Sequence, residues 1–207
     1  MKVRSEARRS AIIATAAELF KEAGYERASM NELAKRLGGS KATLYNYFSS
    51  KEELLVAVVQ AYATGHLAEA MTSLTTGEQS ENLKTVLLRF GESMLVVLTN
   101  DGEALSIYRM IIAEASHSDV GMLFYRSGPS QCIEALAKLL AQAMAQGEIA
   151  DADPQLRALQ FLSLLTAETE LRIYQRHPQP LERHQIRQLV NNAVEMFIAG
   201  ALVGMVK

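Results

Sequence analysis

Apolar residues recur at spacings of three and four along most of the chain, which is the period of amphipathic α-helices. No stretch stands out with the two-residue alternation of a β-strand. Breaks at Gly and Pro divide the pattern, and Gly128-Pro129 interrupts one of the segments. The sequence therefore predicts an all-α protein of about nine helices, at residues 5–23, 30–37, 41–47, 51–73, 80–100, 103–115, 118–146, 154–176 and 181–203.

The stretch from Ser29 to Glu53 predicts two short helices followed by the start of a third. Ser29 with Glu32 has the spacing of a capping box, and Ser50 with Glu53 repeats it. Gly38-Gly39 ends the first helix and Ser40 opens the second. Two helices joined by a tight glycine-containing turn are the helix-turn-helix pattern, whose second helix can enter a DNA major groove.

Composition narrows the class of protein. The chain has 207 residues, of which 49% are hydrophobic, so a sizeable core is possible. Cys132 is the single cysteine, which excludes an intrachain disulfide and suits a reducing compartment. No apolar run reaches the roughly 18 residues of a membrane helix, and the basic N-terminus leads into an amphipathic helix rather than a signal sequence. We expect a cytoplasmic protein with no membrane partner.

Charge is distributed unevenly, although the net charge is only −2. Residues 1–51 carry ten Lys and Arg against five Glu, whereas residues 52–207 carry eleven Lys and Arg against eighteen Asp and Glu. A basic head on an acidic body suggests that the head alone meets a polyanion. We expect residues 1–50 to form a helix-turn-helix DNA-binding domain and residues 51–207 to form a ligand-binding and dimerisation domain.

The second helix of this pattern is rich in hydrogen-bonding side chains. Lys41, Thr43, Tyr45, Asn46 and Tyr47 combine charged, hydroxyl, amide and phenolic groups, which suit phosphate contact and base-edge recognition. The alternative is that the two tyrosines are partly packed and the lysine is merely solvated.

Two sequence motifs carry a family resemblance. The first is Gly24-Tyr25-x-x-Ala-Ser-Met-x-x-Leu-Ala, and the second is Gly-Gly-Ser-Lys-Ala-Thr-Leu-Tyr-x-Tyr-Phe-x-Ser-Lys-Glu-Glu-Leu, which ends at Leu54. Roughly residues 8–55 resemble the DNA-binding domain of tetracycline-repressor (TetR) family regulators, and the helical layout is also similar. The resemblance implies double-stranded DNA as a partner. It implies phosphate contacts by Ser40, Lys41, Tyr45, Tyr47 and Lys51, base-edge contacts by Ala42 and Thr43, and Asn46 at the rim.

Two positions depart from the family pattern. Ala28 stands where the family usually has Thr, which removes one capping or phosphate contact. Gly39 stands where the family usually has a β-branched residue, and we expect it to leave a small gap in the turn. Basic residues near the N-terminus, Lys2, Arg4, Arg8 and Arg9, are expected to add phosphate or minor-groove contacts.

The body carries a second, weaker resemblance. Tyr108-Arg-Met-Ile-Ile-Ala-Glu114 and Phe124-Tyr-Arg-x-Gly-Pro129 resemble the ligand-sensing domain of TetR-like regulators of efflux and stress genes. Soft and aromatic apolar residues around the broken helix predict a cavity for a small apolar or aromatic effector. The alternative is that these side chains simply pack the core. They are Met94, Tyr108, Ile112, Met122, Phe124, Phe161 and Leu165.

The last two helices predict a subunit interface. Apolar residues recur at spacings of four and three in the final helix, and small residues nearby allow close helix approach. Two helices from each of two subunits would form a symmetric four-helix bundle; an ordinary intrachain core helix is the alternative. The predicted interface residues are Leu162, Thr166, Ile186, Val190, Ala193, Phe197 and Ala201.

These observations predict a homodimeric, ligand-responsive transcriptional regulator, most simply a repressor released from a palindromic operator by its effector. A constitutive DNA-binding dimer without effector is one alternative. A helical metal-binding enzyme is another, because Glu114-x-x-His117 has the spacing of a di-iron ligand pair. The chain has no second copy of that spacing and no nucleophile or phosphate-loop motif, so we expect no catalytic residues, no metal and no cofactor.

Overall fold

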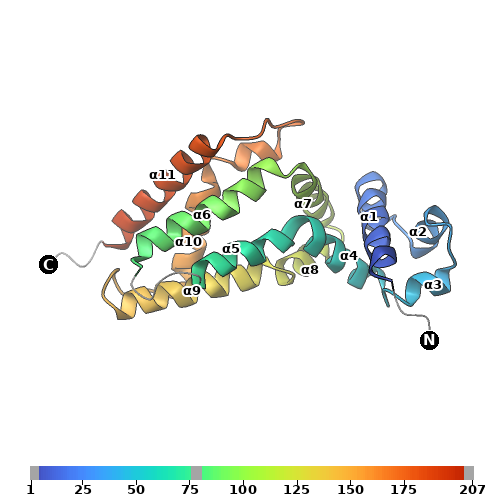
Figure 1. Cartoon of the computed structure of the whole chain (residues 1–207), viewed down its shortest axis with the longest axis horizontal. Helices are drawn as coiled ribbons and strands as arrows, with labels where there is room; N and C mark the ends of the chain where they lie inside the picture. Colours follow the sequence, from blue (N-terminus) through green and yellow to red (C-terminus); the bar gives the residue numbers. More distant parts are fainter. Residues whose placement is uncertain (1–4, 76–80, 203–207) are drawn as a thin grey trace. The chain divides into compact units, whose positions relative to one another are not determined.

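The computed structural model describes residues 5–75 and 81–202, and the regular secondary structure within these residues is entirely helical, as predicted (Figure 1). In this part of the chain, two short elements are not α-helices: the π-helix η1, Gln60–Thr64, and the 3-10 helix η2, Glu170–Ile173. The α-helices are α1 Glu6–Ala23, α2 Met30–Arg36, α3 Lys41–Tyr45, α4 Lys51–Val59, α5 Gly65–Thr75, α6 Leu83–Asn100, α7 Gly102–Glu114, α8 Val120–Arg126, α9 Pro129–Ala145, α10 Pro154–Ala167 and α11 Arg183–Ala201.

Several boundaries differ from the sequence prediction. The segment 118–146 forms two helices, because the chain turns at residues 127–128 and α9 begins at Pro129. The predicted helix 154–176 stops at Ala167 and continues only as η2. α6 is capped by Asn82, whose Oδ1 accepts from the Thr85 N–H at 2.9 Å. The expected break near Gly77 and cap at Ser80 lie outside the described residues, as do Lys2 and Arg4.

The chain folds into two compact units. One comprises the chain up to Gly65 together with residues 103–128, and the other comprises residues 66–102 and 129 onwards. The chain passes between the units after Gly65, Gly102 and Gly128. This division by contacts is not the functional boundary expected at residue 50, which stays a prediction.

The core of the first unit is built around the three N-terminal helices. Phe20, Leu33 and Phe48 are at most 2% exposed, and Leu44 anchors α3 among them. Residues from three later helices belong to the same cluster. These are Leu54, Leu55 and Val58 of α4, Ile107, Met110 and Ile111 of α7, and Val120 of α8.

Serine caps begin the helices of the predicted helix-turn-helix. The hydroxyl oxygens of Ser29, Ser40 and Ser50 each accept from the backbone N–H three residues on, at 3.1 Å in every case. The Glu half of the first capping box is wrong, because the Glu32 carboxylate pairs with Arg36 Nε at 3.4 Å. A serine cap stabilises a helix by about 1 kcal/mol, so the sequence defines these starts locally.

The second unit is a helical bundle around an aromatic centre. α11 packs along α6, and α10 contacts both α11 and α9 (Figure 1). The Phe161 ring lies 6.3 Å from Phe90 and 5.2 Å from Phe197, centroid to centroid. At Gly91 of α6, an added Cβ would lie 2.7 Å from Val190 of α11. The glycine is therefore needed for the close approach of these two helices.

Candidate nucleic-acid interface

α3 is held in place by one side chain and exposes the rest. Leu44 is its single buried residue, at 2% exposure. Because a five-residue helix with one anchor presents its other side chains outward, the structure brings most of the predicted DNA-contacting residues onto one exposed element. The exposed residues there are Ser40, Lys41, Ala42, Thr43, Tyr45 and Asn46.

The polar side chains of α3 and its cap Ser40 also contact one another. Ser40 Oγ and Thr43 Oγ1 lie 2.9 Å apart, in addition to the capping bond that the serine accepts. Lys41 Nζ lies 5.7 Å from the ring centroid of Tyr45, which is 42% exposed. Hydroxyl, ammonium and phenol groups are thus displayed together with the exposed amide of Asn46, the set of donors and acceptors that phosphates and base edges require.

Tyr47 and Lys51 are placed differently from the rest of the predicted set. The Tyr47 ring is half-buried, and its hydroxyl accepts from the Ser5 N–H at 3.2 Å. The Lys51 ammonium donates to the carbonyls of Tyr25 at 3.0 Å and of Glu26 and Ala28 at 3.3 Å. It also lies 4.2 Å from the Tyr25 ring centroid. Lys51 therefore fastens the start of α4 to the α1–α2 turn, a role that the sequence did not reveal.

Two arginines of α1 reach the helix-turn-helix. Arg9 lies over the Phe48 ring, with Cζ 5.1 Å from the centroid. Arg8 Nη2 donates to the Leu37 carbonyl at 3.1 Å, at the end of α2. A Cβ added to Gly39 would lie 3.1 Å from the same nitrogen. The expected gap at Gly39 is therefore wrong, because the Arg8 guanidinium occupies that space.

The predicted effector residues fall into both units. Phe161 and Leu165 are at most 1% exposed in the core of the second unit, and Met94 is half-buried against that core. Phe161 and Leu165 thus match the alternative interpretation, in which they pack the core. Tyr108, Ile112, Met122 and Phe124 belong to the first unit, where the Tyr108 and Phe124 ring centroids are 5.8 Å apart. Tyr108, Ile112 and Met122 are exposed by 36%, 49% and 51%.

The predicted interface residues of α11 are buried within their own chain. None is more than 5% exposed, and all belong to the core cluster of the second unit. Leu162 is half-buried against the same core, and Thr166 Oγ1 donates to the Leu162 carbonyl at 3.0 Å. The apolar stripe of α11 is thus its core face, which is the intrachain alternative. This correction applies to Ile186, Val190, Ala193, Phe197 and Ala201.

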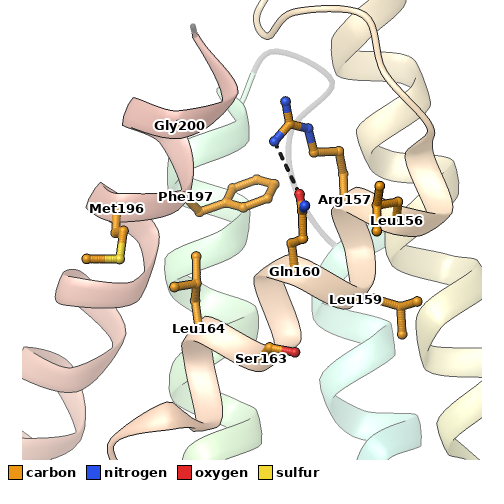
Figure 2. Close-up of a pocket in the computed structure, with 9 residues that line it drawn as sticks. All are labelled: Leu156, Arg157, Leu159, Gln160, Ser163, Leu164, Met196, Phe197 and Gly200. Carbon is orange, nitrogen blue, oxygen red and sulfur yellow. Dashed lines mark hydrogen bonds between the residues drawn. The ribbon is translucent and has the colours of Figure 1, made fainter.

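A second apolar surface lies on the outer side of α10 and α11. An open groove of about 610 Å³ lies between side chains of the two helices. Figure 2 shows nine residues that line it, among them Arg157 and Gln160, which are joined by a hydrogen bond. Leu156, Leu159 and Met196 are 51%, 45% and 65% exposed along it. Sequence periodicity missed this surface because it is shorter and less regular than the core stripe.

An exposed helix-turn-helix, with Arg8 and Arg9 near the start of α1, and a second helical unit define a class of protein, the helix-turn-helix transcriptional regulators. Comparison with known families specifies the class further. Residues 12–58 match the family described as "Bacterial regulatory proteins, tetR family". Residues 85–200, more than half of the chain, match "AefR-like transcriptional repressor, C-terminal domain". The chain belongs to the TetR family of DNA-binding transcriptional regulators.

Individual relatives agree with this membership. The solved structure titled "Flavonoid-responsive Regulator FrrA" is 30% identical with a TM-score of 0.76, covering 97% of this chain and 100% of that one. A putative TetR-family regulator from Mesorhizobium loti MAFF303099 is 25% identical with a TM-score of 0.76, covering 96% and 98%. The HTH-type transcriptional activator FasR of Mycolicibacterium smegmatis is 37% identical over 84 residues, which span 40% of this chain and 38% of FasR.

Membership also answers the question of catalysis. TetR family regulators are not enzymes, and this chain is a regulator rather than an enzyme. Within residues 5–75 and 81–202, no three His, Cys, Asp or Glu side chains are grouped so as to hold a metal ion. None of the helices in the same part of the chain is both long enough and apolar enough to cross a membrane.

Proposed function

We propose that the protein is an effector-controlled repressor that binds a palindromic operator as a homodimer. The observation that carries the proposal is α3, a helix fixed by Leu44 whose remaining side chains are exposed hydrogen-bonding or small groups. Each protomer would insert α3 into a major groove. The two copies would lie about 34–36 Å apart, one turn of B-DNA. A regulator with this target works in the bacterial cytoplasm, where the DNA is.

Selection of bound DNA from a random pool, followed by titration of the selected site, tests operator recognition. Lys41→Ala and Tyr45→Ala should each weaken binding by about 1–3 kcal/mol per protomer, and a dimer carries each substitution twice. Lys138→Ala and Tyr174→Ala are matched controls, because both residues are exposed in the second unit. If all four variants bind like wild type, α3 does not read the DNA.

The α10–α11 groove supports the dimer. Exposed Leu156, Leu159 and Met196 form an apolar surface, and Gly200 has no atom within 4 Å of an added Cβ. Open space beside an exposed methionine suits a symmetric contact in which apolar side chains of each copy enter the groove of the other. The proposed dimer interface is therefore the outer face of α11 and not the face that packs the core.

Sedimentation of variants tests this interface. Met196→Glu and Leu159→Glu place a charge in the proposed contact and should shift the protein to monomers with little change in helicity. Leu171→Glu is the control, because Leu171 is 71% exposed outside the groove. Monomers in all three variants, or dimers in all three, would contradict this assignment.

Control by a small apolar or aromatic effector is the remaining part of the proposal. The match of residues 85–200 to a repressor C-terminal domain supports it, and so does the relative titled as flavonoid-responsive. The alternative is a constitutive DNA-binding dimer. A thermal-shift screen of flavonoids, acyl compounds and other aromatics separates the two, since a ligand at a hundred times its Kd stabilises by about 2.7 kcal/mol. Hits that also release operator DNA support repression, whereas hits that strengthen DNA binding support activation, the role named for FasR.

A further inference from the structure

The N-terminal end of α1, from its cap Ser5 to Arg8, contacts both ends of the α3 region. At one end, the Ser5 N–H donates to the Tyr47 hydroxyl at 3.2 Å. At the other end, Arg8 Nη2 donates to the Leu37 carbonyl at 3.1 Å, in the turn just before α3. These contacts join residues 42 and 29 positions apart in sequence. The orientation of α3 therefore depends on α1 as well as on its own anchor, Leu44.

The backbone does not require glycine at position 39. The preceding Gly38 has φ of +61°, a conformation that favours glycine, but Gly39 is not among the positive-φ residues. What distinguishes position 39 is space: an added Cβ would lie 3.1 Å from Arg8 Nη2. A side chain at this position and the guanidinium of Arg8 therefore compete for one place.

We propose that Arg8 is a positioning residue of the DNA-reading head: its guanidinium takes the place of the side chain missing at Gly39, fixes the turn before α3, and presents a positive charge to the operator backbone. The inference rests on the proposed operator binding and specifies how one part of it works. Arg8 and Gly39 then act as a pair, so that the effect of changing one depends on the other.

The surroundings of Arg8 favour a phosphate as the further partner. A guanidinium carries five N–H donors, and the Leu37 carbonyl takes one in this structure. Gly38, Gly39, Ser40 and Lys41, which follow Leu37 in the chain, are all exposed. A planar guanidinium held on one side by a carbonyl has donors on its other edges for phosphate oxygens.

Arg8→Met tests the charge, because Met keeps a long apolar stem and removes the donors. If each protomer of this variant makes one phosphate contact fewer, the slope of log K against log salt should fall by about 2 per dimer. The same slope corresponds to about fivefold weaker binding per contact at 0.15 M salt, or roughly thirtyfold per dimer. Lys138→Met is the control and should leave the slope unchanged. Arg8→Lys should keep most of the slope, since it keeps the charge.

A double-mutant cycle with Gly39→Val tests the pairing. In the wild-type background, the new valine side chain should displace the guanidinium and weaken operator binding about as much as Arg8→Met does. In an Arg8→Ala background, the same valine fills vacant space, so it should raise the thermal midpoint and have little effect on DNA affinity. Gly39→Val should therefore lower the thermal midpoint when Arg8 is present and raise it when Arg8 has been replaced by Ala.

The outcomes separate this inference from the proposed function. An unchanged salt slope in Arg8→Met overturns the phosphate contact, and equal effects of Gly39→Val in both backgrounds overturn the pairing. A wild-type protein that selects no DNA sequence overturns the proposed function instead. In that case the stability cycle still decides whether Arg8 and Gly39 share one space, because it needs no DNA.

Discussion

Replacing Lys51 with Met distinguishes a structural clamp from a DNA contact. The resemblance to TetR regulators assigned Lys51 to a phosphate, whereas the structure shows its ammonium on the carbonyls of Tyr25, Glu26 and Ala28. Methionine retains the apolar stem and removes the charge and all three donors. The variant should therefore lose stability if the clamp is the main role.

The magnitude follows from the surroundings of each contact. The bonds to Tyr25 and Ala28 are partly buried and contribute about 1 kcal/mol each, while water can replace the Lys51 bond to the exposed Glu26 carbonyl. The ammonium 4.2 Å from the Tyr25 ring centroid adds about 1 kcal/mol. The free energy of unfolding should fall by about 3 kcal/mol, which for a chain of this length lowers Tm by roughly 6–12 °C.

Thermal denaturation followed by circular dichroism measures this change, with Lys138→Met expected within about 0.5 kcal/mol of wild type. Operator titrations at several salt concentrations complete the test. A Lys51→Met protein that melts with wild type but whose salt slope falls by about two units per dimer would refute the clamp and restore the phosphate contact.

Three further changes test local geometry. Gly24→Ala should lower stability by about 2 kcal/mol in thermal melts, because φ is +79° and the new Cβ would lie 2.5 Å from Glu114 Oε1; an unchanged Tm would show that this turn relaxes freely. Gly65→Ala should destabilise by at least about 1 kcal/mol, since its Cβ would lie 2.5 Å from the Gln60 carbonyl oxygen within the π-helix; a gain in Tm, as for an ordinary helical Gly→Ala change, would contradict this. Burial raises the pKa of the Cys132 thiol to about 11, so only about one molecule in a thousand is thiolate at pH 8. Iodoacetamide should therefore label Cys132 only after unfolding. Rapid labelling of the native protein, read by mass spectrometry, would refute the burial of this side chain.

Local signals made the helix-turn-helix predictable. A serine cap or a Gly-Gly turn acts within four residues, so Ser29, Ser40 and Ser50 could be assigned as helix starts from their spacing alone. The exposure of α3 follows in the same way, because Leu44 is the one apolar aliphatic side chain larger than alanine between Gly39 and Asn46.

Contacts between distant segments were not predictable from spacing. The stripe from Ile186 to Ala201 has the period of an apolar helix face, and a core face and a subunit interface share that period. The burial of these side chains within their own chain identifies the stripe as the core face of α11. The sequence around Lys51 and Arg8 does not indicate whether these side chains bind a backbone carbonyl of the same chain or a phosphate, since carbonyls and phosphates are both oxygen acceptors. These assignments needed the three-dimensional neighbours.

Residues 103–128 share a core with the three N-terminal helices, and this limits how the reading head can be exchanged between regulators. A fragment ending at residue 50 would leave behind Leu54, Leu55, Ile107, Ile111 and Val120, all at most 3% exposed in the intact chain. A graft that joins this head to another body has to carry α7 and α8 with it or match their apolar surface. The part of the chain that supports DNA recognition is thus discontinuous in sequence. Recombination at a single crossover would separate the three N-terminal helices from the α7 and α8 residues that complete their core.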